Sequence, residues 1–119
     1  MEINKMAINA HNNAVDKGFH SLEYSILNKI TMDKRFTEEE WTAVHNAFKS
    51  MGLMLIVSEA AEAMEALRKN DVANFNEEVA DIGIRLGDFS HNYGVPLESE
   101  IVKKMAINKE RPNKHNKLF

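Results

Sequence analysis

Two carboxylate pairs are the residues of this sequence whose types and spacing best suit chemistry. Glu59 and Glu62 form the first pair, and Glu78 and Asp81 form the second. On a helix, the two members of each pair lie about 60° apart on one face. Two consecutive antiparallel helices would point all four acids at one place. Converging carboxylates require cations, which are either divalent metal ions that also bind a phosphate or the lysines of a neighbouring helix.

The residues around the acids favour a metal. Leu55, Ala63 and Ala66 fall within about 40° of the arc of the first pair, so these acids emerge from a small, apolar surface. In the two helices expected to carry these acids, only Arg85 is placed to neutralise the cluster. One guanidinium does not compensate four carboxylates. Carboxylate oxygens are the ligands that Mg²⁺ and Mn²⁺ prefer. A solvated acidic helix face is the alternative, and spacing alone does not decide between the two.

A basic segment near the end of the sequence offers groups that bind phosphate. Lys104, Asn108 and Arg111 are spaced i, i+4 and i+7, which places them on one face of a helix end. Residues 1–102 carry a formal charge of −8, whereas residues 103–119 carry +5. Such a tail suits an anion bridged to the acidic body through metal. The alternative is a basic helix end that is favoured by the helix dipole.

The elements that must position these groups read as helices. We expect helices over 3–17, over 37–69 with Gly52 either breaking the helix or lying within it, over 72–93 and over 97–109. Thr37 to Glu40 reads as a capping box, and Gly18 and Gly94 are expected stops. The pattern over 19–36 is irregular. The sequence therefore predicts one all-α domain over 1–119, an antiparallel bundle of four to five helices with the catalytic helices packed in a homo-oligomer.

Composition excludes several other classes of protein. The 119 residues include no cysteine, so a disulfide framework and a thiolate metal site are excluded. The most apolar run, over 51–57, is far too short to span a membrane. We expect a cytoplasmic protein without a membrane partner. The acidic body and a basic tail with almost no aromatic residues also argue against nucleic-acid binding.

Three stretches in this order carry a family resemblance. Residues 53–69, residues 77–86, and a tail with Lys104-Met105, Asn108, Arg111-Pro112, His115 and Lys117 resemble the MazG-like branch of the all-α nucleoside triphosphate pyrophosphohydrolases. The match covers about residues 53 to 119, and residues 16–19 resemble the step that follows the first helix of the family.

The resemblance implies hydrolysis of a nucleoside triphosphate between its α and β phosphates, which gives the monophosphate and pyrophosphate. Mg²⁺ or Mn²⁺ would be held by Glu59, Glu62, Glu78 and Asp81. Water would be the nucleophile, with Glu59 or Glu62 as the base. The positions that match phosphate-binding residues are Lys104, Asn108 and Arg111, with Arg85 as an addition. We expect a deoxynucleoside triphosphate as substrate, and a role in nucleotide-pool control or house-cleaning.

The resemblance also implies a base pocket and an assembly. Asn12 and Phe19 are candidates to read and stack on the base, although a capping asparagine and a core phenylalanine are equally ordinary. The family implies a homodimer or a dimer of dimers, and Gly83 and Gly87 would permit close helix approach.

The chain departs from the family pattern in two places. Asn116 stands where the family has a glycine. The stretch between Phe19 and Leu53 is longer than in compact relatives, with Phe36, Trp41 and Phe48 among its apolar residues. This stretch is added core, a dimer contact or a lid over the base, and we expect core.

Two other functions remain open from the sequence. The first is a pyrophosphohydrolase of another nucleotide, such as phosphoribosyl-ATP, since that family shares the acidic scaffold. The second is a non-enzymatic helical dimerisation or regulatory module whose acids meet basic residues across an interface. Metal binding separates the second from an enzyme, because a filled four-carboxylate site should raise thermal stability.

Overall fold

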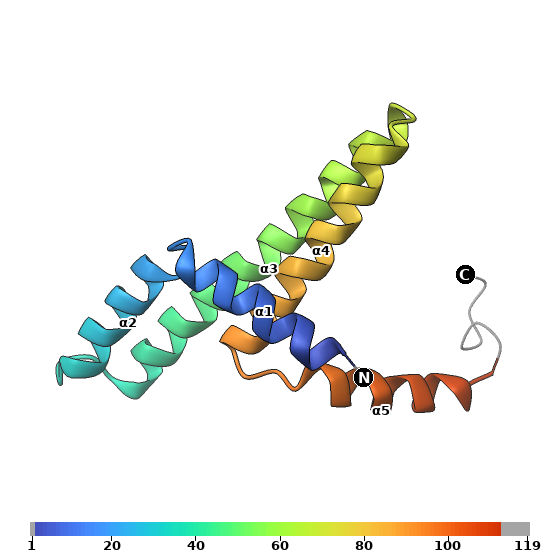
Figure 1. Cartoon of the computed structure of the whole chain (residues 1–119). Helices are drawn as coiled ribbons and strands as arrows, with labels where there is room; N and C mark the ends of the chain where they lie inside the picture. Colours follow the sequence, from blue (N-terminus) through green and yellow to red (C-terminus); the bar gives the residue numbers. More distant parts are fainter. Residues whose placement is uncertain (1, 113–119) are drawn as a thin grey trace.

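A computed structural model describes residues 2–112, and this part of the chain consists of helices joined by short loops, without a strand (Figure 1). The prediction of an all-α fold is confirmed. The five helices are α1 (Ile3–Asp16), α2 (Ser21–Met32), α3 (Glu38–Arg68), α4 (Val72–Asn92) and α5 (Leu97–Lys109).

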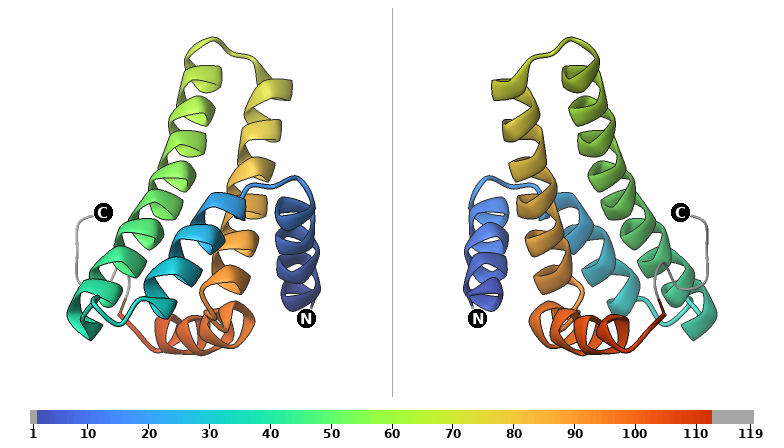
Figure 2. Two further views of the ribbon diagram at one scale, coloured as in Figure 1. Left: turned by 90° about the vertical axis from the view of Figure 1, so that its left-hand side faces the viewer. Right: turned by 90° about the vertical axis from the view of Figure 1, so that its right-hand side faces the viewer.

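Helices α3 and α4 form a long antiparallel hairpin that is the frame of the molecule (Figures 1 and 2). The predicted capping box is present: the Glu40 amide donates to Thr37 Oγ1 and the Thr37 amide donates to the Glu40 carboxylate, both at 3.1 Å. The hairpin turns at Asn70, which has a φ of 57°, and the Asp71 side chain caps α4. These local signals fix where the two acid-bearing helices begin and end.

Helix α1 packs along the C-terminal half of α4. A Cβ added at Gly87 would lie 3.1 Å from the Ala7 Cα, so the glycine allows the backbones of the two helices to approach closely. A Cβ added at Gly83 would meet nothing within 4 Å. Within the described residues, Gly87 is thus the member of the predicted glycine pair that allows a close helix contact, and this contact is made within one chain. Helix α5 is joined to the start of α1, because the Glu98 carboxylate accepts from the Ile3 amide at 3.1 Å.

The segment that looked irregular contains α2. Its apolar residues do not fall on one clean stripe: Ile30 is buried, whereas Leu22 and Met32 are exposed. Helix α2 leans on the first half of α3, where Trp41 Nε1 donates to Thr31 Oγ1 at 3.0 Å. The expectation that this stretch adds core is not met at Phe36 and Trp41, which remain exposed.

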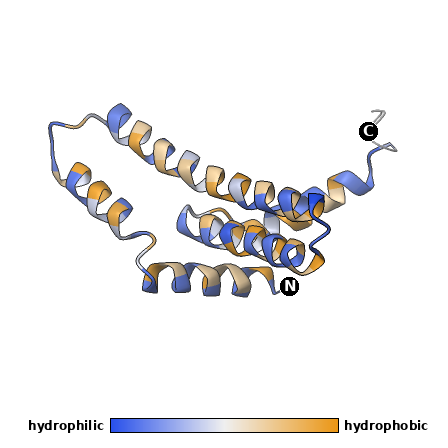
Figure 3. Cartoon of the chain, turned by 90° about the horizontal axis from the view of Figure 1, so that it is seen from above, coloured by the Kyte–Doolittle hydropathy of each residue, from blue (hydrophilic) through white to orange (hydrophobic). Residues whose placement is uncertain are grey.

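The molecule is elongated. Its radius of gyration is 17.7 Å, whereas a compact chain of this length would have roughly 13 to 14 Å. Figure 3 shows apolar positions recurring along α3, and many of the large apolar side chains of that helix are exposed. Among the helices over residues 2–112, none is long and apolar enough to cross a membrane.

Candidate metal centre

Three of the four predicted acids converge between α3 and α4. Glu59 comes from α3, and Glu78 and Asp81 come from α4, and one carboxylate oxygen from each lies within 4.8 Å of the others. Glu62 is not part of this group. It lies one turn nearer the hairpin tip and is exposed, although its charge is close enough to raise the pKa of Glu78. The predicted four-acid site is thus a three-acid cluster with a fourth carboxylate beside it.

Among residues 2–112, Arg85 is the cation paired with the cluster, and it compensates less charge than the three carboxylates carry. Arg85 Nε donates to Glu59 Oε1 at 2.6 Å, and this hydrogen bond lowers the pKa of Glu59. The pKa of Glu78 is raised, first by its hydrogen bond with Glu59, then by burial and by the charges of Glu59, Asp81 and Glu62. A protonated Glu78 relieves the repulsion, and so would a divalent cation. The donor set is all oxygen, which fits Mg²⁺ or Mn²⁺.

The cluster borders a partly open cavity of about 400 Å³ lined by residues of α1, the turn before α2, α2, α3 and α4. Glu59, Asp81 and Arg85 form its charged wall. Aromatic and aliphatic side chains form most of the rest: Phe19, Leu22, Phe48, Met51, Leu55, Ile84, Phe89 and Tyr93. His20, Glu23 and Asp88 form a second polar region. An apolar cavity with a few convergent polar groups is typical of a small-molecule site.

Most of the other predicted site residues do not line this cavity. Phe19 lines it, but Asn12 does not, and the next residue, Asn13, does. Lys104, Asn108 and Arg111 lie on or just after α5, and none of them lines the cavity. Figure 1 shows α5 at the opposite end of the molecule from the tip of the α3–α4 hairpin. His115, Asn116 and Lys117 lie outside the described residues.

The second polar region was missed from the sequence. Asp88 follows Asp81 and Arg85 at i+7 and i+3, on the same face of α4, and this spacing was available as a signal. His20 and Glu23 sit in the stretch that lacked a clear pattern, so nothing in the sequence indicated that they face α4.

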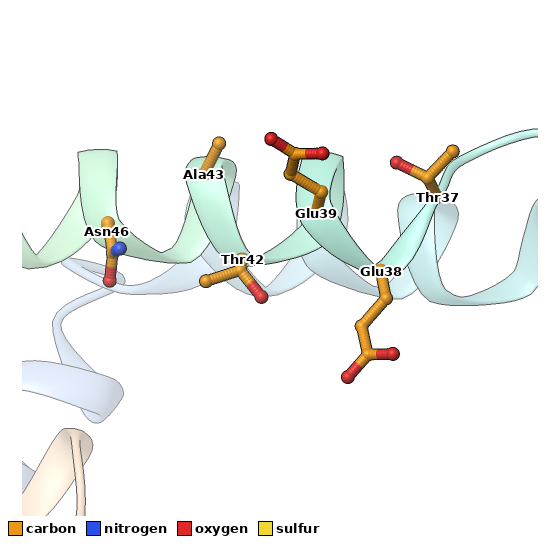
Figure 4. Close-up of a pocket in the computed structure, with 6 residues that line it drawn as sticks. All are labelled: Thr37, Glu38, Glu39, Thr42, Ala43 and Asn46. Carbon is orange, nitrogen blue, oxygen red and sulfur yellow. The ribbon is translucent and has the colours of Figure 1, made fainter.

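A second, open hollow lies at the start of α3 and is shown in Figure 4. Its lining residues are Thr37, Glu38, Glu39, Thr42, Ala43 and Asn46. The carboxylates of Glu38 and Glu39 point to different sides of the helix in this view, so they do not converge on a cation.

Comparison of the chain with protein-family models, with curated proteins and with solved structures gives no significant match.

Proposed function

We propose that this protein is a metal-dependent nucleoside triphosphate pyrophosphohydrolase. The observation that supports the proposal best is the placement of Glu59, Asp81 and Arg85 on one wall of a largely apolar cavity that includes four phenylalanine and tyrosine rings, with Glu78 completing the carboxylate cluster. Charged oxygen ligands suit a cation that binds phosphates, and the aromatic walls suit a nucleoside. A cavity of about 400 Å³ is within the usual range of small-molecule sites.

The reaction joins a water oxygen to the α-phosphorus and breaks the bond between that phosphorus and the oxygen bridging to the β-phosphate. A bound Mg²⁺ or Mn²⁺ would polarise the phosphoryl oxygens and neutralise the charge of the leaving pyrophosphate. Glu59 or Glu62 accepts the proton of the water. Glu59 is a weak base while Arg85 holds it, and it becomes a stronger base when the guanidinium turns to a phosphate.

Arg85 is suited to this exchange. Its ion pair with Glu59 uses Nε, and within residues 2–112 its terminal nitrogens have no other hydrogen-bonded partner. The planar fork of a guanidinium matches the oxygens of a phosphate. Lys104, Asn108 and Arg111 lie outside the cavity wall of their own chain, so in this proposal they act at the phosphates of a neighbouring subunit.

An apolar stripe on α3 supports a homo-oligomer. Leu53, Val57, Met64 and Leu67 are each 50 to 54% exposed, and with Ala60 they fall within about 80° on the helix. This face points away from the carboxylates. A second copy of the chain would cover it and bury the large apolar side chains, as a homodimer or a dimer of dimers.

The test is pyrophosphate release from the eight common ribo- and deoxynucleoside triphosphates, with Mg²⁺ and with Mn²⁺. We expect release from at least one deoxynucleoside triphosphate, and a loss of roughly 100-fold or more in kcat for Glu59→Gln and Asp81→Asn. Glu65→Gln is the matched control, because Glu65 is exposed on α3 and, within the described part of the chain, its ion pairs are with Arg68 and Lys69.

Two results would overturn the proposal. One is the absence of pyrophosphate release from any common or damaged nucleoside triphosphate. The other is unchanged activity in the Glu59 and Asp81 variants. Product analysis with phosphoribosyl-ATP separates the related pyrophosphohydrolase, and an unchanged melting temperature with metal would favour the non-enzymatic module.

A further inference from the structure

A second cluster of metal-ligating side chains lies where α1, the turn before α2, and α4 meet. His11 Nδ1 lies 2.9 Å from Asp88 Oδ1, and His20 Nε2 lies 2.8 and 2.9 Å from the two Asp88 oxygens. The three side chains are only 12 to 19% exposed. One ligand atom from each lies within 4.8 Å of the other two. Two imidazoles and one carboxylate therefore converge on a single point from segments far apart in the sequence.

The second nitrogen of His20 is held by a carboxylate. His20 Nδ1 lies 3.2 Å from Glu23 Oε2, and Glu23 in turn accepts from the Tyr93 hydroxyl at 2.7 Å. A neutral imidazole has one N–H, so His20 can donate to Glu23 or to Asp88 but not to both. If Nδ1 donates to Glu23, then Nε2 presents a lone pair toward the Asp88 oxygens. That arrangement requires a cation beside Nε2, which is a second proton or a metal ion.

The charge balance of the cluster favours a divalent ion. Glu23 is 9% exposed, and within the described residues neither Glu23 nor Asp88 forms an ion pair with a lysine or an arginine. Buried carboxylates need a compensating charge. Two carboxylates and two neutral imidazoles sum to −2, which one divalent cation neutralises. A histidine that is bound by metal on one nitrogen and by a carboxylate on the other is a common arrangement in metal sites.

The distances also fit a shared ion. Ligand atoms with bonds of about 2.0 to 2.1 Å to one metal lie roughly 3 Å apart. The N–O separations of 2.8 and 2.9 Å between Asp88 and the two histidines are close to this spacing.

We propose that His11, His20 and Asp88 bind one divalent transition-metal ion of the class that imidazole prefers, such as Zn²⁺, Co²⁺ or Ni²⁺. Mixed nitrogen and oxygen ligands select these ions over Mg²⁺. The site is distinct from the carboxylate cluster, since Asp88 lies two helical turns, about 10 Å, from Asp81. The ion fixes α1 and α2 against α4, and because His20 and Asp88 line the cavity, its open position faces the cavity.

Binding of Zn²⁺ to the metal-stripped full chain, followed by calorimetry, tests the site. A Glu59→Gln/Asp81→Asn background removes two ligands of the carboxylate cluster, so one remaining equivalent of Zn²⁺ reports the histidine site alone. We expect at least a tenfold weaker affinity after adding His11→Gln or His20→Gln, and no change after adding His45→Gln. His45 is the matched control because its ring contacts Trp41 on α3, with the two ring centroids 3.8 Å apart, and does not line the cavity.

A Co²⁺ complex of the chain in the same background gives a readout that does not depend on the folding of the histidine variants. Visible absorption and X-ray absorption fine structure should report one Co²⁺ with imidazole scattering from two histidines. An ion without imidazole ligands, no bound ion, or unchanged Zn²⁺ affinity in the His20 variant would overturn the proposal and leave a second proton as the cation. None of these results depends on pyrophosphate release.

Discussion

At the residue scale, Glu78 is the member of the carboxylate cluster that most needs a cation. Its pKa is raised chiefly by Glu59, so the folded state favours the protonated form. The contribution of Glu78 to stability is therefore fully present below its unfolded pKa and is lost as pH rises through the folded value.

In EDTA at neutral pH, Glu78→Gln should raise the melting temperature, because it removes the repulsion between Glu78 and the neighbouring carboxylates. The same variant should lose most of the melting-temperature increase that Mn²⁺ gives the native chain. A lower melting temperature in EDTA would contradict this account, and Glu77→Gln is the control.

Glu59 titrates in the opposite sense. Arg85 lowers its pKa below the ordinary value of 4.5, so the stabilisation is present above that pH and is lost as pH falls through the folded value. Arg85→Gln should reduce the free energy of unfolding at pH 7 by at most about 1 kcal/mol, since the guanidinium is partly exposed. The difference between the variant and the native chain should shrink toward pH 3. Urea titrations between pH 3 and 7 measure it, and a difference that is constant across this range would argue against the ion pair.

The sequence predicted that acids of α3 and α4 converge, but it did not predict which of the four acids lies outside the cluster. Helical spacing and apolar neighbours indicated Glu59, Glu78 and Asp81 correctly as a converging group, and they indicated Arg85 as the compensating cation. Glu62 was included because it shares a helix face with Glu59. It lies outside the group because the position along α4 that faces each turn of α3 is set by the hairpin turn and by packing, and a single-helix pattern does not contain that offset.

At the element scale, two glycines on α4 make a matched experiment. Gly87 lies against α1, where a Cβ would come 2.7 Å from Met6 Sδ and 3.1 Å from the Ala7 Cα, and Gly83 has nothing within 4 Å. Gly87→Ala should destabilise the chain by about 1 to 3 kcal/mol through overpacking. Gly83→Ala should stabilise it by about 0.5 to 1 kcal/mol through helix propensity. Denaturant unfolding in EDTA measures both. Loss of stability in both variants would mean that Gly83 also lies in a close contact, as between subunits.

Helix boundaries were predictable where a local signal marks them, and α2 was not. As expected, the capping box at Thr37 begins α3. Gly18 and Gly94, both with positive φ, follow the ends of α1 and α4. Helix α2 lacks a clean apolar stripe because much of what it presents to its neighbours is polar, with Glu23 buried among hydrogen bonds. Gly52 lies within α3 and does not break it. A Cβ at this position would come 2.8 Å from the Phe89 ring, so the glycine allows α3 and α4 to pack closely.

At the scale of the whole molecule, the position of α5 decides whether its basic residues reach the acids of the same chain. The sequence predicted Lys104, Asn108 and Arg111 on one face of a helix end, but their relation to the acids depends on how α5 is oriented after Pro96, and no periodicity encodes that orientation. In the described chain, α5 packs against α1 and does not approach the cavity. If these side chains bind the phosphates, they reach them in a neighbouring subunit, which ties activity to assembly.

The exposed stripe on α3 makes this link testable. A lysine at Val57 or Met64 would place a charge in the proposed interface, where burial without a partner is costly. The native chain should elute at twice or four times its mass of 13.6 kDa, and Val57→Lys and Met64→Lys should shift the mass measured by light scattering toward the monomer. Ser58→Lys is the control, because Ser58 lies on another face of the helix and is exposed.

The monomeric variants should also lose pyrophosphate release. Mixing such a variant with a Glu59→Gln chain that keeps the native apolar stripe should restore part of the release only if the two chains still pair. A native chain that is already monomeric at micromolar concentration would exclude the assembly, and full activity in a monomeric variant would show that the basic helix does not act across subunits.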